Sequence, residues 1–341
     1  MMMMVAVCLG ACGSSSDAKE TLYVYNWSEY IPEEVYELFE EETGIHVVES
    51  TFSSNEEMLA KMVAGGASQY DVIIASNYVL EAMKAQGFIQ QIDTSHIENF
   101  SNLYDEYVGM SYDPDNSYSV PYMATVTVIA ANREMCEELG VEITCFEDLL
   151  NPALENNIVA VDDCREIVGI ALKAAGIDPD TTDQAEIESV LPWLEELSTN
   201  IKLYDSDTPY TALLTNEVAV GIVYNMDAAL AIAENDAISV ITTTEPDEMS
   251  VDNFTISSEC ENVEAAEAFI NFILRPDIYK MCLDAYPCIN LNAAAEELLD
   301  AAYLENEGSN LDRTEVARAH IIGDVGDAAE YYDAVFSEMK N

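Results

Sequence analysis

The strongest constraint on the fold of this chain is an alternation of two hydrophobic patterns. Between residues 21 and 87, runs typical of strands (21–27, 45–51 and 70–76) alternate with segments of helical periodicity (32–44, 54–66 and 77–87). Gly44, at the end of the first helical segment, is a typical helix stop. Such an alternation predicts a mostly parallel sheet with helices on both faces.

A second unit of the same kind begins near residue 157. Its expected strands are 157–161 and 217–224, and its expected helices are 164–176, 183–198 and a segment from Asp227 onward. Two extended, β-rich segments, 119–134 and 238–257, can cross between the units, and one helix is expected at 262–282. We therefore expect an α/β protein with two lobes and a cleft between them.

The chain is strongly acidic, with 65 Asp and Glu against 12 Lys and Arg and a net charge of −53. Nucleic-acid binding needs a basic face, and an anionic membrane surface attracts basic segments, so neither partner is expected. After residue 20, no apolar run approaches the roughly 20 residues of a membrane span.

The first 20 residues have the pattern of an export signal and a polar tether. Within them, Leu9-Gly10-Ala11-Cys12 resembles the lipobox of bacterial lipoproteins. The resemblance implies lipidation of Cys12 and a location on the outer face of the cytoplasmic membrane, or in the periplasm. An ordinary cleaved signal peptide is the alternative. No Lys or Arg precedes the apolar run, which leaves the completeness of the start open.

Cysteine and histidine spacing gives no sign of a metal centre or of nucleophilic catalysis. Six cysteines follow residue 20, namely Cys136, Cys145, Cys164, Cys260, Cys282 and Cys288. Their spacing allows the disulfides Cys136–Cys145 and Cys282–Cys288, or six free thiols, but matches no zinc motif. The three histidines lie far apart in the sequence. Neither a metal nor a cofactor is expected, whereas a glycosidase with two carboxylates stays open on composition.

The expected strand ends carry an unusual concentration of aromatic and acidic residues. In open parallel sheets, ligands bind outside the carboxyl ends of the strands. The residues found there are Trp27, Ser28, Glu29, Tyr30, Ser76, Tyr78, Asp163, Glu166 and Tyr224. Carboxylates pair with ammonium groups, and aromatic faces bind cations and methylenes. The pattern therefore favours an elongated organic cation over a sugar.

Each of these residues also has a simpler structural explanation. Asp163 is suited to cap a helix, with Glu166 completing a capping box, and Ser76 could cap the next helix. Trp27, Tyr30 and Tyr224 could be core aromatics. Within the first strand, Tyr23 and Tyr25 are expected to pack.

Five segments together resemble the bacterial spermidine/putrescine-binding proteins of ABC importers, within the extracellular solute-binding proteins. They are LYVYNWSEYIPEEVYELFEEETGIHV, STFSSNEEMLAK, YDVIIASNYV, VDDCREIVGIAL and AFINFILRPD. The resemblance implies a two-lobed periplasmic-binding-protein fold of type II, hinge strands and a polyamine ligand. It places the aromatic box on Trp27, Tyr30, Tyr78, Tyr224 and Tyr286, and the ammonium-binding acids on Asp163, Glu166 and Asp252. Ser28, Glu29 and Ser76 are implied as polar neighbours.

The resemblance further implies a monomeric binding protein without enzymatic activity that delivers polyamine to an ABC permease. The expected lobes are residues 21–125 with 250–295, and residues 126–249 with 296–341. The chain departs from the family pattern at Tyr224, commonly tryptophan, at Ser250, usually aromatic, and at Ile322, usually polar. Another cation, an oligosaccharide or a glycoside-hydrolase activity are the alternatives.

Overall fold

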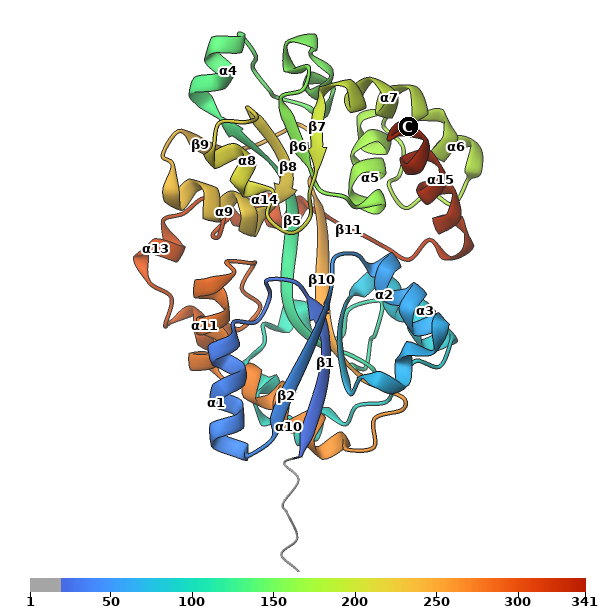
Figure 1. The fold of residues 1–341 in the computed structure, drawn as a ribbon, viewed down its shortest axis with the longest axis vertical. Coiled ribbons are helices and arrows are strands. Elements are labelled where there is room, and N and C mark those ends of the chain that lie inside the picture. Colours follow the sequence, from blue (N-terminus) through green and yellow to red (C-terminus); the bar gives the residue numbers. More distant parts are fainter. Residues whose placement is uncertain (1–19) are drawn as a thin grey trace, which may run out of the picture.

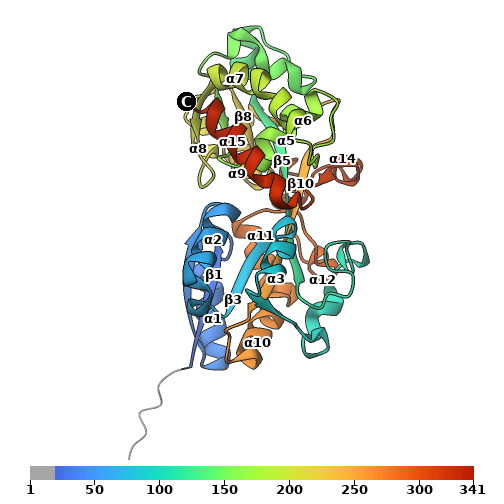
Figure 2. The ribbon, with the colours of Figure 1, turned by 90° about the vertical axis from the view of Figure 1, so that its right-hand side faces the viewer.

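The computed structural model of the protein describes residues 20–341. Figure 1 shows two lobes stacked along the long axis of the molecule, and Figure 2 shows them in a view turned by 90°. The export signal and Cys12, which the sequence predicts, lie outside the described residues.

Both lobes combine strands and helices. The strands are β1 (Thr21–Trp27), β2 (His46–Phe52), β3 (Val72–Ser76), β4 (Ile89–Gln90), β5 (Val120–Asn132), β6 (Ile158–Ala160), β7 (Ile201–Tyr204), β8 (Val220–Tyr224), β9 (Ile238–Ile241), β10 (Glu248–Ser257) and β11 (His320–Ile321). The α-helices are α1 (Glu33–Thr43), α2 (Asn55–Lys61), α3 (Leu80–Ala85), α4 (Arg133–Leu139), α5 (Cys164–Ala174), α6 (Gln184–Ser189), α7 (Leu191–Asn200), α8 (Tyr210–Leu214), α9 (Asn225–Glu234), α10 (Val263–Ile273), α11 (Pro276–Ala285), α12 (Ala293–Glu296), α13 (Ala301–Leu304), α14 (Arg313–Arg318) and α15 (Ala329–Met339).

The first lobe, lower in Figure 1, is formed by β1–β4 with α1–α3, α10 and α11, and the second by β6–β9 with α4–α9 and α15. In the first lobe β1 pairs in parallel with β2 and β3, and in the second β6 pairs in parallel with β7 and β8. The long strands β5 and β10 run antiparallel between the two sets and join the lobes. The predicted two-lobed α/β class is confirmed.

Local sequence signals explain where several elements begin and end. Gly44 ends α1 in the left-handed conformation, with φ of 79°, and Ser54 caps α2 by accepting a hydrogen bond from the Glu57 amide. All 13 residues of β5 are buried, which fits a strand covered on both faces. At the far end of the chain, α15 packs on α5 and α7 in the second lobe.

Some details of the sequence interpretation need correction. The single helix expected at 262–282 is two helices, because Pro276 cannot continue α10 and instead starts α11. Tyr23 is exposed rather than packed, whereas Tyr25 is buried. Of the two states left open for the six cysteines, the structure has free thiols rather than disulfides. None of the helices between residues 20 and 341 has the length and apolar character to cross a membrane.

Candidate ligand-binding site

A small cavity of about 50 Å³ lies between the lobes, where the strand ends of both meet. It is lined by Trp27, Ser28, Tyr30, Asn55, Ser76, Tyr78, Thr125, Asp163, Glu166, Ser206, Tyr224, Met226, Ser250 and Asp252. Nine of the eleven predicted ligand-binding residues are in this set, whereas Glu29 and Tyr286 are not. Residues that follow different strands and lie far apart in the sequence therefore meet in one cavity.

Asp252 is the carboxylate on the first-lobe side of the cavity. It lies on β10 opposite Ser76 of β3, and the pairing of β10 with β5 shifts register directly after it. Such bulges re-aim side chains next to functional sites. The Tyr30 hydroxyl donates to Oδ2 at 2.6 Å and the Ser76 hydroxyl to Oδ1 at 2.7 Å. Burial raises the pKa of Asp252 to about 6, although both hydrogen bonds act to lower it.

Ser76 therefore does not cap the helix that follows it. Its side chain makes no capping hydrogen bond and binds Asp252 instead. Of the two interpretations of Ser76, the structure therefore supports a residue that lines the cavity over a helix cap.

Asp163 caps a helix, as the sequence suggested, and it also lines the cavity. Its Oδ1 caps α5 by accepting from the amides of Arg165 at 2.9 Å and Glu166 at 3.2 Å. Its Oδ2 accepts from the Tyr224 hydroxyl at 3.4 Å and lines the cavity. Burial raises the pKa of Asp163 above its ordinary value, against the lowering effect of these hydrogen bonds.

Glu166 is the most poorly compensated acid of the cavity. It is 3% exposed, and its Oε2 has no hydrogen-bond partner among the described residues. Burial, followed by the neighbouring charge of Asp163, raises the pKa of Glu166 well above its ordinary value. An unpaired buried carboxylate is costly, so this position favours a cationic partner.

Aromatic rings provide much of the remaining wall. Tyr78 is buried, and its hydroxyl accepts a hydrogen bond from Asn55 Nδ2 at 2.6 Å. Trp27 packs on Phe52 with ring centroids 4.5 Å apart, and Tyr30 meets Tyr122 edge to face at 5.4 Å. These contacts hold the rings in place, as expected for the wall of a binding site.

No Lys, Arg or His belongs to the described residues that line the cavity. Arg165 is the nearest base in sequence, but its guanidinium donates to Asp180 at 2.7 Å and to the Gly323 carbonyl at 2.9 Å. The three carboxylates Asp163, Glu166 and Asp252 are therefore not neutralised from within the cavity wall. The electrostatics of the cavity favour a cation.

Glu29 and Tyr286 lie in a second acidic region beside the cavity. Glu29 has a positive φ of 52° and is exposed, and partial desolvation of its carboxylate, followed by Asp207 and Asp205, raises its pKa. Tyr286 is half-buried, and Glu29 is the charge that raises its pKa most after burial. The structure thus places these two predicted residues near each other, outside the wall of the cavity.

Asp227 is an acid of this region that the sequence interpretation missed. It is 1% exposed, and neither of its oxygens has a hydrogen-bond partner among the described residues. Burial, followed by Asp205, Glu29 and Asp207, raises its pKa well above the ordinary value. We expected a helix to begin at Asp227, but α9 begins two residues earlier, at Asn225, so Asp227 is the third residue of the helix, and it is buried.

Two of the departures from the family pattern can now be placed. Ser250 lines the cavity and is hydrogen-bonded to Thr125 at 2.9 Å, so a polar pair stands where an aromatic ring is usual. Ile322 is buried and packs against the cluster that contains Tyr78, outside the cavity wall. The side chain of Ile322 therefore does not take the polar position considered from the sequence.

The lobes are held in contact across the cleft by direct hydrogen bonds. Asp207, from the second lobe, accepts from the hydroxyls of Ser28 at 2.6 Å and Ser53 at 2.9 Å, both in the first lobe. With only about 50 Å³ between the walls, the cavity holds little more than a water molecule or two. An elongated ligand therefore needs the lobes to separate before it can enter.

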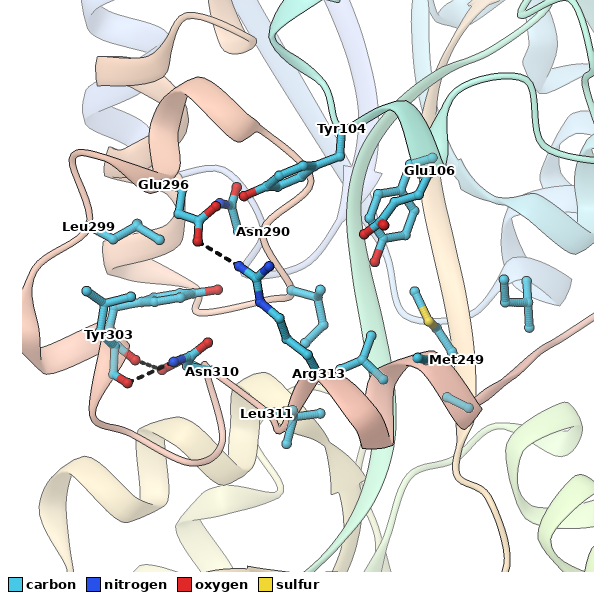
Figure 3. Close-up of a pocket in the computed structure, with 18 of the residues that line it drawn as sticks. Tyr104, Glu106, Met249, Asn290, Glu296, Leu299, Tyr303, Asn310, Leu311 and Arg313 are labelled. Atoms are coloured by element: carbon cyan, nitrogen blue, oxygen red, sulfur yellow. Dashed lines mark hydrogen bonds and ion pairs between the residues drawn. The ribbon is translucent and has the colours of Figure 1, made fainter.

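A larger cavity of about 440 Å³ lies elsewhere, next to Met249 of β10 and Arg313 of α14 (Figure 3). None of the predicted site residues lines it. Its Arg313 forms an ion pair with Glu296 at 2.7 Å, and Glu106 is a second carboxylate on its wall. The wall of this cavity thus contains a base, whereas the described lining of the interlobe cavity contains none.

The fold and the cleft together define a two-lobed binding protein that encloses its ligand between the lobes. The family model of the bacterial extracellular solute-binding proteins matches residues 24–280, and the chain belongs to this family. The expectation that the chain is not an enzyme is thereby confirmed, since the family consists of binding proteins.

Individual relatives resemble the chain over most or nearly all of its length. It is 35% identical over 337 residues, 98% of this chain and 96% of the relative, to the spermidine/putrescine-binding periplasmic protein of Salmonella typhimurium. It is 28% identical, over 80% of this chain and 79% of the relative, to the putrescine/cadaverine-binding protein of Pseudomonas aeruginosa.

Solved structures give the same result. The spermidine/putrescine ABC transporter substrate-binding protein of Streptococcus pneumoniae is 30% identical and superimposes with a TM-score of 0.78, over 94% of this chain and 98% of that one. A lipoprotein of Treponema pallidum is 27% identical, with a TM-score of 0.82 over 94% and 99% of the two chains. The resemblance found in the sequence is confirmed.

Proposed function

We propose that this protein binds a polyamine in the interlobe cleft and delivers it to the membrane subunits of an ABC importer. The observation that carries the proposal is the convergence of Asp163, Glu166 and Asp252, each 5% exposed or less, on a cavity lined by no base among the described residues. The names of the relatives support the same ligand class.

The position of the charges suggests how a polyamine would lie. One ammonium group would pair with Asp163, Glu166 or Asp252, and the methylenes would lie against Trp27 and the tyrosines, where cation–π contact adds about 0.5–2 kcal/mol. A second ammonium would lie toward Glu29 and the unpartnered Asp227. In this arrangement each charged end of the ligand has carboxylate partners.

Ligand binding is coupled to closure of the lobes in this account. The proposed lobes are residues 21–125 with 250–295, and residues 126–249 with 296–341, moving about β5 and β10. A ligand that touches both lobes binds the closed form more tightly, and so shifts the open–closed equilibrium toward it. The protein would act as a monomer, tethered to the outer face of the cytoplasmic membrane through a lipid on Cys12.

A thermal-shift panel tests the proposed ligand class. At pH 7.5 we expect putrescine or spermidine at 1 mM to raise the melting temperature by several degrees, because a ligand that binds only the native state stabilises it. Arginine and a maltose-type oligosaccharide, added at the same concentration, should leave it unchanged. A rise in melting temperature with the oligosaccharide alone would contradict the polyamine proposal and indicate a sugar as the ligand.

A further inference from the structure

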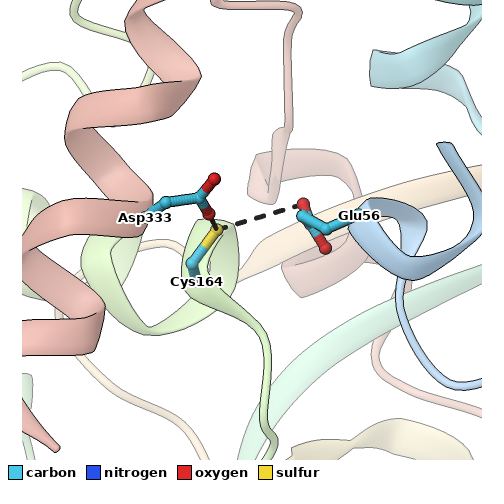
Figure 4. Close-up of side chains that lie close together, drawn as sticks. All are labelled: Glu56, Cys164 and Asp333. Carbon is cyan, nitrogen blue, oxygen red and sulfur yellow. Dashed lines mark hydrogen bonds between the residues drawn. The ribbon is translucent and has the colours of Figure 1, made fainter. Parts of the chain in front are cut away.

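A cluster of three potential metal ligands spans the two lobes beside the cavity. Glu56 comes from α2 of the first lobe, and Cys164 and Asp333 come from α5 and α15 of the second (Figure 4). The Cys164 Sγ lies 3.1 Å from Asp333 Oδ1 and 4.0 Å from Glu56 Oε1. The ligand atoms of all three residues lie within 4.8 Å of one another.

The charges of this cluster are not balanced by the protein. A thiol has one proton to donate, yet Cys164 faces two carboxylates. Among residues 20–341, neither Glu56 nor Asp333 forms an ion pair with Lys, Arg or His. Burial, then Asp163 and Asp333, raise the pKa of Glu56 to about 7, and burial with three carboxylates raises that of Cys164 well above its ordinary value.

A second cluster of potential metal ligands differs from this one in its charge balance. Asp178, Asp180 and His320 also lie within 4.8 Å of one another. There, however, Asp180 is paired with Arg165 at 2.7 Å and with His320 at 2.9 Å. That group already has its positive charges, whereas the group around Cys164 has none from residues 20–341.

We propose that Glu56, Cys164 and Asp333 form a site for a divalent transition metal of the zinc type, which bridges the two lobes. A sulfur donor with two carboxylates suits Zn²⁺ or Cd²⁺, whereas Ca²⁺ and Mg²⁺ take oxygen ligands. On a tetrahedral zinc, bond lengths of roughly 2.0–2.3 Å place two ligand atoms about 3.4–3.6 Å apart. The distances of 3.1 and 4.0 Å bracket this value, so only small side-chain movements are needed.

Metal binding at this site releases the thiol proton of Cys164, and any proton held by Glu56, to solvent. The metal is then bound by one thiolate and two carboxylates, and water completes the fourth position. Because Glu56 and Cys164 belong to different lobes, the bound metal stabilises the closed form. The site directly adjoins the cavity, since Asn55 and Asp163 are its neighbours in sequence, but it shares no residue with the cavity wall. It requires no polyamine and does not rest on the proposed function.

Titration of the reduced, full-length chain with Cd²⁺ tests the site. A thiolate–Cd²⁺ bond gives an ultraviolet charge-transfer band that carboxylates alone cannot give, so the band reports on a cysteine even in a very acidic protein. We expect it to saturate at one Cd²⁺ per chain, and to be absent from Cys164→Ser. The matched control is Cys136→Ser, which should keep the band, because the Cys136 thiol is hydrogen-bonded to a backbone carbonyl and not to a carboxylate.

Substitution of Glu56 distinguishes a metal site that bridges the lobes from one formed by the second lobe alone. Glu56→Gln should weaken Cd²⁺ binding at least tenfold, as should Asp333→Asn, whereas Glu37→Gln on the exposed face of α1 should have no effect. If Cys164→Ser fails to fold, these two variants decide the matter. An intact band in Cys164→Ser, the absence of a band at millimolar Cd²⁺, or unchanged affinity in Glu56→Gln would overturn the proposal.

Discussion

The two sides of the cleft hold their carboxylates in different ways. On the first-lobe side, both oxygens of Asp252 accept hydrogen bonds, from Tyr30 and Ser76. On the second-lobe side, both oxygens of Asp163 also accept hydrogen bonds, but Glu166 has an oxygen without a partner and Asp227 has two, among the described residues. The pKa of Asp252 is accordingly raised only to about 6, whereas those of Glu166 and Asp227 are raised well above their ordinary values.

This difference suggests that the two lobes contribute to different steps of ligand binding. Hydroxyl donors prepare the Asp252 carboxylate to stay ionised near neutral pH before a ligand arrives. Glu166 and Asp227 of the second lobe would gain a counter-charge when a cation binds between the lobes. Ligand recognition would then begin at the first lobe, and closure would depend on the second.

The largest loss of polyamine affinity is expected when the carboxylate of Asp252 is removed. Asp252→Asn keeps the size of the side chain but loses the negative charge, and loss of one partner of a buried ion pair costs about 2–5 kcal/mol. Polyamine affinity measured by calorimetry should therefore fall at least about 30-fold. Glu37→Gln is the control, and an equal loss there would mean that the carboxylates act only through the net charge.

A smaller loss of affinity is expected from the second-lobe acid. Glu166→Gln should weaken binding about tenfold or more, since one counter-charge of the ammonium is lost. The melting temperature of the unliganded variant at pH 7.5 should be unchanged or higher, because a neutral amide replaces a carboxyl whose ionised form is costly when buried. A lower melting temperature with unchanged affinity would show that Glu166 is structural.

Binding should weaken as the pH falls through about 6. The folded-state pKa of Asp252 is raised above its unfolded value, so its contribution to the stability of the unliganded protein is present at low pH and is lost as the pH rises through about 6. A bound cation favours the ionised form of Asp252. Below about pH 6, where this carboxylate takes up a proton, polyamine affinity should therefore fall about tenfold per pH unit. The ligand-induced shift in melting temperature should be larger at pH 7.5 than at pH 5.

Tyr30→Phe sharpens the same prediction. Removal of one hydrogen bond to Asp252 raises its pKa further, so the pH at which binding weakens should move upward. Affinity at pH 7.5 should fall by about tenfold at most, less than in Asp252→Asn. An unchanged pH profile would mean that Asp252 is not the group that titrates.

The smallest effect is expected from the hydrogen bonds that hold the lobes together. Asp207→Ala removes the acceptor of both Ser28 and Ser53, but Asp207 is exposed, and exposed interactions contribute little. We expect affinity to change about threefold or less, mainly through faster ligand release in stopped-flow experiments. A large loss would place Asp207 among the ligand-binding groups.

The fold was predictable because its signals are local and repeated. Hydrophobic periodicity indicated the strands and helices of both lobes, and the strand-end rule alone was enough to group Asp163, Tyr78 and Trp27, which line one cavity. For α10 and α11, the prediction of helix was correct, but the prediction of one continuous helix was wrong, because Pro276 starts a new helix.

Other parts of the site depend on tertiary structure. Asp252 lies within β10 at a register shift, not at a strand end, so only the resemblance to a known family pointed to it. The sequence indicated only that a helix begins near Asp227, and the burial of this side chain depends on how α9 packs against the rest of the chain. Asn55 and Ser206 reach the cavity only because the lobes face each other.

The most direct test of the account is a calorimetric titration of the full-length protein with spermidine and putrescine at pH 7.5. The account predicts saturable binding of at least one of them at one ligand per chain, with an affinity that falls as the pH is lowered through about 6. The absence of heat at millimolar polyamine at both pH 7.5 and pH 5, with no shift in melting temperature, would contradict the claim that the buried carboxylates of the cleft bind an organic cation.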